Sequence, residues 1–330
     1  MATVRELIFK ITGDNEKFKT AIDESKKALD DFNQKTKDAS DLYGSIAKQA
    51  AIATTAIAAV GIATAKMAVE FNEGFGKVQT LIPGATERIA ELEENVLNLS
   101  PAVGKTTKDL TEGLYEIISA FGDSADSAKN LELAAKGATA GGATTKESIK
   151  LLSAVTKAYG NTSFEAQKRV SDLAFTTLKL GQTSMSDLAV SMQRVTSMSN
   201  VLGVSQEELF AIFSSGTGVI GGATEVSTKL SAVYTELQKP QERLAKSFKE
   251  LGVATGEELI AKFGGLSGAL QALKSVADKT GEPISNLFGS AEAGKLALYA
   301  AGEGAAKFAS DLEAMNESAG ATDRHLTMQL

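Results

Sequence analysis

Residues 104–109 read Gly-Lys-Thr-Thr-Lys-Asp, and a similar stretch recurs about every forty residues through the middle of the chain. Each copy has a glycine, then Thr or Ser, and in most copies an acid three positions after the hydroxyl. The four copies are Gly104 with Thr106 and Asp109, Gly142 with Thr144 and Glu147, Gly181 with Ser184 and Asp187, and Gly222 with Thr224. The hydroxyl residues stand 38, 40 and 40 positions apart, as in a chain that stacks one small unit.

Each copy predicts a helix start. In the first three, we expect the hydroxyl to accept a hydrogen bond from the first helical turn while the acid reaches back, which is a capping box. The acid also suits the positive end of the helix dipole. In the fourth copy Ser227 stands where the acid would be.

A second helix start lies inside each period, after a residue suited to ending the previous helix. These starts are Ser124 or Asp126 after Gly122, Ser163 after Gly160, Ser205 with Glu208 after Gly203, and Pro240 after Leu237. Each period therefore predicts two helices.

Apolar residues follow the first starts at helical spacing. The stripes are Leu110, Leu114, Ile117 and Phe121; Ile149, Leu152, Val155 and Tyr159; Leu188, Met192 and Val195; and Val226, Leu230, Val233 and Leu237. Each helix carries one such apolar stripe, so each helix buries a single face. We expect an all-α array of helical hairpins, α-solenoid-like or an irregular helical bundle. The alternative is an ordinary all-α domain whose regular spacing follows from helix length alone.

The N-terminal residues differ from this pattern. Leu7, Phe9 and Ile11 alternate as in a β-strand, Gly13 and Asp14 make a turn, and Phe18, Ile22, Leu29 and Phe32 form a helical stripe. We expect a short strand and a long helix within residues 1–45. The strand offers an edge for pairing with a second copy or a partner.

Residues 49–65 carry no charge and are rich in Ala. As a helix these residues would reach roughly 26 Å, which is short of the bilayer core of about 30 Å. We expect an Ala-rich uncharged helix over residues 46–71, packed closely against partners. The alternative is a helix that makes transient contact with a membrane at one stage.

The composition offers little to catalysis. The chain has no Cys and one His, His325, so a thiolate nucleophile, a His-dependent triad or a His metal site has almost nothing to be built from. The net charge of −7 argues against tight binding of nucleic acid, and we expect no sequence-specific contact with it. We therefore predict no enzyme activity, no cofactor, and no catalytic, cofactor-binding or metal residues.

One stretch imitates a phosphate-binding loop. Residues 289–295 have its spacing up to Lys295, but Leu296 has no hydroxyl for magnesium and Glu292 would face the phosphates. We interpret this stretch as a helix start. The glycine pairs at 141–142, 221–222 and 264–265 are interpreted as turns between helices.

From about Ala65 to Phe308 the chain resembles the tape measure proteins of long-tailed bacteriophages and related contractile particles. The resemblance lies in the succession of four segments, at residues 68–71 (Ala-Val-Glu-Phe), 181–188, 203–209 (Gly-Val-Ser-Gln-Glu-Glu-Leu) and 286–289 (Asn-Leu-Phe-Gly). The strand and helix of residues 4–36 are similar to the usual start of that family.

The resemblance implies a structural phage protein. It would set tail tube length during assembly, occupy the tube lumen and leave on genome ejection. Some members of that family then act at the host envelope, which is an open role for this chain. It would be made in the host bacterial cytoplasm and reside in the virion. The implied partners are the tail tube protein, tail assembly chaperones, and baseplate or tail-tip proteins, with self-association also open. No catalytic residues carry over.

The predicted organisation is residues 1–45, 46–71, a hairpin core region over 72–320, and 321–330 as the start of a truncated helix. Family members usually continue further, so we expect an N-terminal fragment of a longer protein. Two other functions stay open. One is a membrane-active or pore-forming helical protein, which needs residues 49–65 to insert into lipid. The other is a solenoid protein-binding scaffold with a concave face.

Overall fold

The computed structural model describes residues 69–324, and these residues are helical with short connections. The β-type pairing among them is an isolated bridge between Thr217 and Gly221. The expected all-α fold is confirmed. The strand and long helix predicted for residues 1–45, residues 49–65 and His325 all lie outside the described residues. Among the described residues, 77–324 belong to one compact unit, and the packing described below is within that unit.

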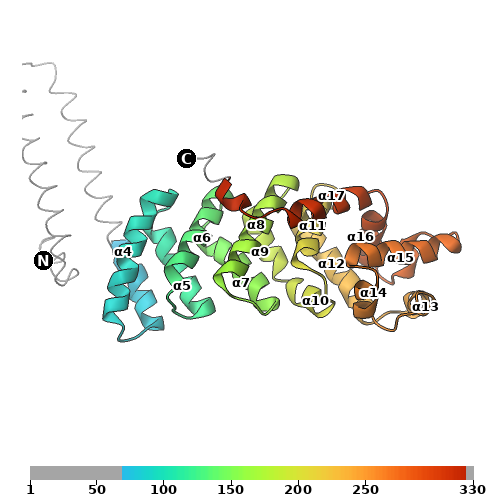
Figure 1. The fold of residues 1–330 in the computed structure, drawn as a ribbon, viewed down its shortest axis with the longest axis horizontal. Coiled ribbons are helices and arrows are strands. Elements are labelled where there is room, and N and C mark those ends of the chain that lie inside the picture. The colour runs from blue at the N-terminus through green and yellow to red at the C-terminus, as the bar shows by residue number, and fades with distance from the viewer. Residues whose placement is uncertain (1–68, 325–330) are drawn as a thin grey trace, which may run out of the picture. The chain divides into compact units, whose positions relative to one another are not determined.

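The helices lie side by side along a row (Figure 1). They are α4 (Thr86–Val103), α5 (Thr107–Phe121), α6 (Ser127–Ala140), α7 (Thr145–Ala158), α8 (Phe164–Leu180), α9 (Met185–Met192), α10 (Thr196–Val201), α11 (Gln206–Gly216), α12 (Ala223–Gln238), α13 (Glu242–Glu250), α14 (Gly256–Lys262), α15 (Leu266–Lys279), the 3-10 helix η1 (Ile284–Leu287), α16 (Ala291–Ala301) and α17 (Ala305–Asn316). Residues 69–81 and 321–324 are also helical.

Alternate helices stack into two layers. In one layer α5 packs on α7, α7 on α9, α9 on α12 and α12 on α16. In the other layer α4 packs on α6, α6 on α8 and α8 on α11. First helices of successive hairpins therefore pack on first helices, and second on second, which is the solenoid arrangement that the period predicts.

The predicted stripes form the core between these layers. Leu110, Leu114, Val226 and Leu230 are all completely buried. Burial of a leucine side chain contributes about 1.5–3 kcal/mol relative to leaving it exposed. Small residues let successive helices of one layer approach closely: a Cβ on Gly113 of α5 would lie 2.4 Å from Cγ2 of Thr145 on α7. The same need for compactness explains why many buried positions are Ala, Ser or Thr.

Most predicted helix starts are confirmed. Thr106, Thr144, Ser163, Ser184 and Ser205 are N-caps, and each hydroxyl accepts a hydrogen bond from the backbone N–H three residues on. Asp126 is also an N-cap residue, although its side chain makes no cap bond. The glycines that precede several starts have positive φ, as helix-ending glycines do: Gly104 closes α4 at φ 67°.

Two predicted starts are wrong by one or two residues. The N-cap of α12 is Gly222, so Thr224 lies inside the first turn, where its carbonyl accepts from the Ser227 hydroxyl at 2.8 Å. Gly222 takes the extended backbone of an N-cap residue, so the helix begins before Thr224 is reached. Helix α13 begins at Glu242 with Gln241 as the N-cap residue, one place after Pro240.

The third period departs from the prediction of two helices. The stripe of Leu188, Met192 and Val195 is buried as expected, but the helix ends at Met192 and a new one begins at Thr196. The N–H of Val195 donates to Met192 O, three residues back, which closes a four-residue turn in place of the α-helical bond to the fourth residue back. This tighter turn keeps Val195 in the core while redirecting the chain. After α12, the helices α13 to η1 are inserted before the row resumes with α16.

Candidate functional site

The first site to consider is the contact between successive hairpins, where acidic side chains bind the start of the next helix. Asp109 does not complete the predicted capping box with Thr106. Its carboxylate instead accepts the backbone N–H of Thr145, at 3.1 and 3.2 Å, and the Thr145 hydroxyl. The start of α7 lies within reach of Asp109 because α5 packs on α7. An acid in the first turn of one period thus binds the first helix of the next period.

Glu147 makes both kinds of contact. It forms a complete capping box with Thr144, and its other oxygen accepts the Ser186 hydroxyl of α9 at 2.7 Å. The backbone N–H of Thr144, followed by the Ser186 hydroxyl, lowers the pKa of Glu147 because both stabilise the ionised form. Asp187, at the third start, accepts the hydroxyl of its own cap Ser184 at 2.7 Å. The predicted capping box is therefore complete at one of the three places.

Two further carboxylates reach helix starts more than fifty residues away. Glu208 accepts the N–H of Leu266 at 3.0 Å and of Ser267 at 3.1 Å, at the start of α15. Burial raises the pKa of Glu208, and the hydrogen bonds from the backbone N–H groups of Leu266 and Ser267 lower it by less, so the pKa is raised overall. Glu236 of α12 accepts the N–H of Gly289 at 2.6 Å and of Ser290 at 2.9 Å.

The contact of Glu236 explains the phosphate-loop imitation. The backbone donors before α16, which a phosphate would need, are bound by the chain's own carboxylate. Ser290 also donates its hydroxyl to Glu236, at 2.7 Å, and is itself the N-cap of α16. Residues 289–295 are thus a helix start held by α12, as the sequence interpretation has it. The glycine pairs likewise flank helix ends: Gly141 follows α6, Gly222 precedes α12 and Gly265 precedes α15.

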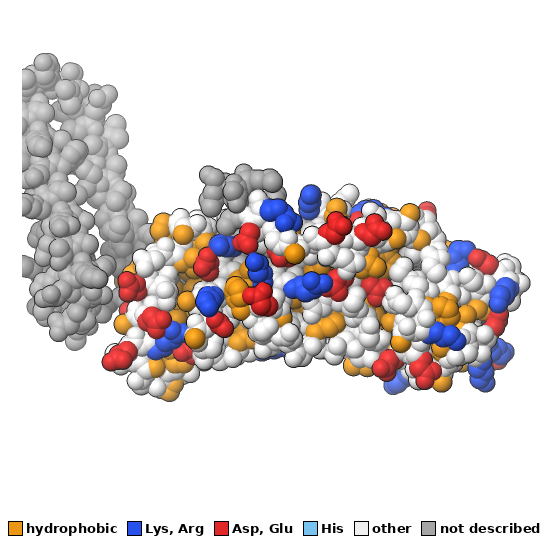
Figure 2. All heavy atoms as spheres, viewed as in Figure 1, with side chains coloured by type: hydrophobic (Ala, Val, Ile, Leu, Met, Phe, Trp, Pro, Cys, Tyr) orange, Lys and Arg blue, Asp and Glu red, His pale blue; other side chains and the backbone are white. Residues whose placement is uncertain are grey.

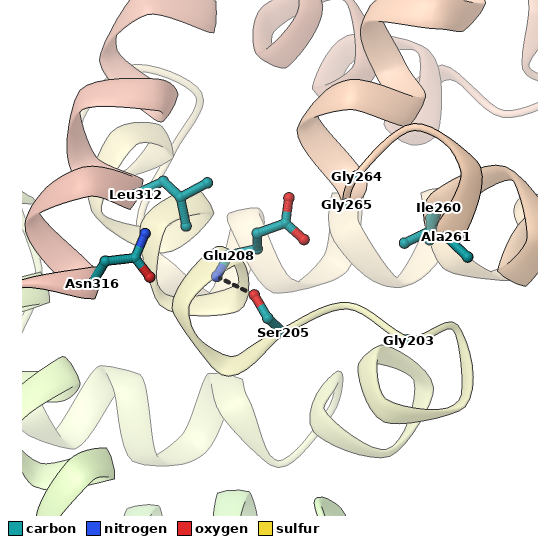
Figure 3. A pocket seen from close by; sticks show the side chains of 9 residues that line it. All are labelled: Gly203, Ser205, Glu208, Ile260, Ala261, Gly264, Gly265, Leu312 and Asn316. Carbon is teal, nitrogen blue, oxygen red and sulfur yellow. Dashed lines mark hydrogen bonds between the residues drawn. The ribbon is translucent and has the colours of Figure 1, made fainter.

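A depression of about 390 Å³ lies where α11, α14, α15 and α17 meet (Figure 3). It is lined by Gly203, Ser205, Glu208, Ile260, Ala261, Gly264, Gly265, Leu312 and Asn316. Glu208 stands in its centre, and the Ser205 hydroxyl accepts the Glu208 N–H at 3.1 Å. Both polar groups therefore already hold helix starts. The lining contains no second acid, histidine or cysteine beside Glu208 with which it could form a catalytic pair.

The buried tyrosine hydroxyls are structural as well. Tyr159 donates to Val204 O at 2.9 Å, Tyr234 lies 3.0 Å from the Ser199 hydroxyl, and Tyr299 donates to Ser215 O. Burial raises the pKa of all three, so the phenols stay neutral. Within residues 69–324, no group of His, Cys, Asp or Glu has a metal-binding arrangement. That the whole chain has no site residues stays a prediction.

The surface adds no concentrated charge on the face that Figure 2 shows, where Lys and Arg are interspersed with Asp and Glu. Some charged side chains pair between successive hairpins: Arg88 binds Asp123 at 3.0 Å and Arg169 binds Glu207. Among the described helices, none is both long and apolar enough to cross a membrane.

The geometry is that of a structural array, and comparison with known proteins agrees. A model of the phage-related minor tail protein family matches residues 93–296. The chain belongs to the phage-related minor tail protein family. It is therefore a structural, virion-associated protein of a phage tail, as the sequence resemblance implied. No solved structure matches the chain.

A relative within the phage tail proteins extends the match. A protein of Clostridium phage phiCD119 described as a probable tape measure protein is 24% identical over 279 residues, which is 80% of this chain. The chain spans 29% of the length of that relative. The array of α5 to α12 lies inside the residues that the minor tail family model matches.

The sequence reveals some of these contacts and not others. The caps are visible because a hydroxyl and its donor stand three residues apart. The roles of Glu208 and Glu236 are not, because their targets lie 58 and 53 residues further on. Glu208 stands three residues after Ser205, a pattern that predicts only a local contact, and no local pattern distinguishes Glu236 from an ordinary acid on a helix.

Proposed function

We propose that the chain is part of a tape measure protein that lies in the lumen of a phage tail tube, sets tube length during assembly and leaves on genome ejection. The observation that carries this proposal is the alignment of 80% of the chain with a protein described as a probable tape measure protein. The minor tail family match supports it. The proposed partners are the tail tube protein, tail assembly chaperones, and baseplate or tail-tip proteins, with synthesis in the host bacterial cytoplasm.

The folded array spans a short distance for the number of residues it contains. A continuous helix advances about 1.5 Å per residue, whereas stacked hairpins advance only about 8–10 Å for each pair of helices. We therefore propose that the hairpins open when the chain is loaded into the tube, and that the described fold is the free or ejected state. The supporting observation is helix α6, where Ala134, Ala135 and Ala138 are buried. Such small side chains bury little area, so opening this helix costs less than opening a helix that buries only leucines.

Deletion of one period tests the ruler directly. Removing residues 106–143 joins Lys105 to Thr144, so one helix cap replaces another and the remaining hairpins keep their pattern. If the region is extended as a helix in the tail, the tail shortens by about 57 Å. If the hairpins remain stacked, it shortens by about 10 Å. A duplication of the same residues is the matched control and must lengthen the tail by the same amount. Unchanged tails in both variants would contradict a ruler role for this region.

Location is tested by mass spectrometry and immunogold labelling of particles before and after triggered ejection. We expect the polypeptide inside intact tails and its loss after ejection. Particles that never contain it would refute the proposal. Cryo-EM density for folded hairpins inside an intact tail would overturn the opening step while leaving the ruler role to the deletion experiment.

A further inference from the structure

The C-terminal described residues do not continue the row. We define the strap as α17 together with residues 317–324. In Figure 1 the strap lies along the row, running back from α16 past α11 towards α8. Its contacts with α8 run in opposite order: Lys307 reaches Leu180 O, Met315 contacts Thr177, and Thr322 contacts Ser171. The strap therefore lies antiparallel to α8.

The strap also packs on α11. Asp311 accepts the Ser214 hydroxyl at 2.7 Å and the Lys307 ammonium at 2.7 Å. Phe308 and Met315 are completely buried. Because α8 and α11 are neighbours in one layer, the strap joins two successive periods from outside that layer. It lies beyond residue 296, where the family match ends.

The end of the strap is held by a buried carboxylate. Asp172 of α8 is 3% exposed and accepts the N–H of Gly320 at 2.7 Å and of Thr322 at 2.9 Å. Hydrogen bonds to a charged group are stronger than those between neutral groups, and a buried polar group left without a partner is costly. Detachment of residues 320–322 would leave the buried Asp172 carboxylate without these two donors. We therefore expect the strap to be either fully bound to α8 and α11 or fully detached from them.

The position of the strap changes how the array can open. In a simple solenoid each unit contacts only its neighbours, so units can unfold one after another from an end. The Asp172–Thr322 contact instead joins residues 150 positions apart. Tension applied at the two chain ends passes through this contact and bypasses residues 173–319. Those residues can lengthen only after the strap is released.

We propose that the strap is a latch that keeps α8 to α16 folded as one unit, and that its release is the committing step for extension of this region. That extension occurs in the tail rests on the function proposed above. The latch itself is a property of the isolated chain, so it is tested without particles and its failure is separable from failure of the ruler role.

The test is force spectroscopy of the full chain, tethered at Met1 and Leu330. We expect release of the strap to free one large step of about 540 Å, from 150 residues at about 3.6 Å each. In Asp172→Ala we expect the rate of that step at fixed force to rise at least about tenfold. Asp109→Asn is the matched control, because Asp109 also binds a helix start but not the strap. It is expected to leave the step unchanged.

A reversible lock provides the second test. The Ser171 and Thr322 hydroxyl oxygens are 3.1 Å apart, and the chain has no native cysteine to compete. Oxidised Ser171→Cys/Thr322→Cys should remove the large step and slow hydrogen exchange throughout α8 to α16, and reduction should reverse both effects. The proposal is overturned if residues 173–319 lengthen in small steps before the strap opens. It is equally overturned if Asp172→Ala behaves as Asp109→Asn, or if the disulfide leaves exchange in α8 to α16 unchanged.

Discussion

Replacing Glu236 with alanine should loosen α16 more than any change of a single surface charge. Glu236 is 7% exposed and accepts three hydrogen bonds, from the N–H groups of Gly289 and Ser290 and from the Ser290 hydroxyl. Gly289 is exposed, so water can replace part of what is lost. With about 1.5–3 kcal/mol for a bond to a charged group, we expect a loss of about 2–4 kcal/mol.

The assay is equilibrium urea unfolding together with hydrogen exchange of α16, which reports the local opening directly. A loss of 2–4 kcal/mol corresponds to roughly 30-fold to several hundredfold faster exchange in the first turns of α16. Glu236→Gln keeps an acceptor and should lose about half as much. Glu292→Ala is the matched control, since it removes an exposed acid from the same helix start and should cost about 0.3–1 kcal/mol. Equal effects of Glu236→Ala and Glu292→Ala would refute the reasoning.

Three other predictions concern the packing of Gly113, the pKa of Glu147 and the backbone donors before α16. Gly113→Ala should destabilise by about 1–3 kcal/mol in urea unfolding, because the added methyl would lie 2.4 Å from Thr145 Cγ2; a gain in stability would show that α5 and α7 pack less tightly. The folded-state pKa of Glu147 is lowered from 4.5, so its contribution to stability is fully present above that value and is lost as the pH falls through the folded-state pKa. The stability difference between the wild-type chain and Glu147→Gln should accordingly shrink on acidification, and a difference that is independent of pH would contradict this assignment. Nucleotide should leave the melting temperature unchanged, because Glu236 already binds the donors before α16, whereas a clear rise would mean that phosphate displaces it.

The proposed opening of the hairpins and the proposed latch together predict how variants of the chain behave during tail assembly. If the tail accepts this region only in extended form, the disulfide-locked Ser171→Cys/Thr322→Cys chain should block loading under oxidising conditions. The Asp172→Ala chain should load normally, since its latch is weaker. Such an experiment joins the two proposals after each has been tested separately.

The sequence by itself determined the fold class, the face that each helix buries and most helix starts. These features are local. A cap such as Thr144 and its donor at Glu147 are three residues apart, and a stripe such as Val226, Leu230, Val233 and Leu237 spans a single helix. The succession of these segments was also enough to indicate the phage tail family, which the family match then showed.

The tertiary structure alone decided what binds across the periods. Asp109 looked like half of a capping box, yet it binds the start of α7, because Thr145 lies in reach once α5 packs on α7. The break after Met192 was invisible, since the buried stripe continues through it. Glu236 and Asp172 read as ordinary acids on helices. Their partners, 53 and 150 residues away, meet them only after the layers stack and the strap folds back.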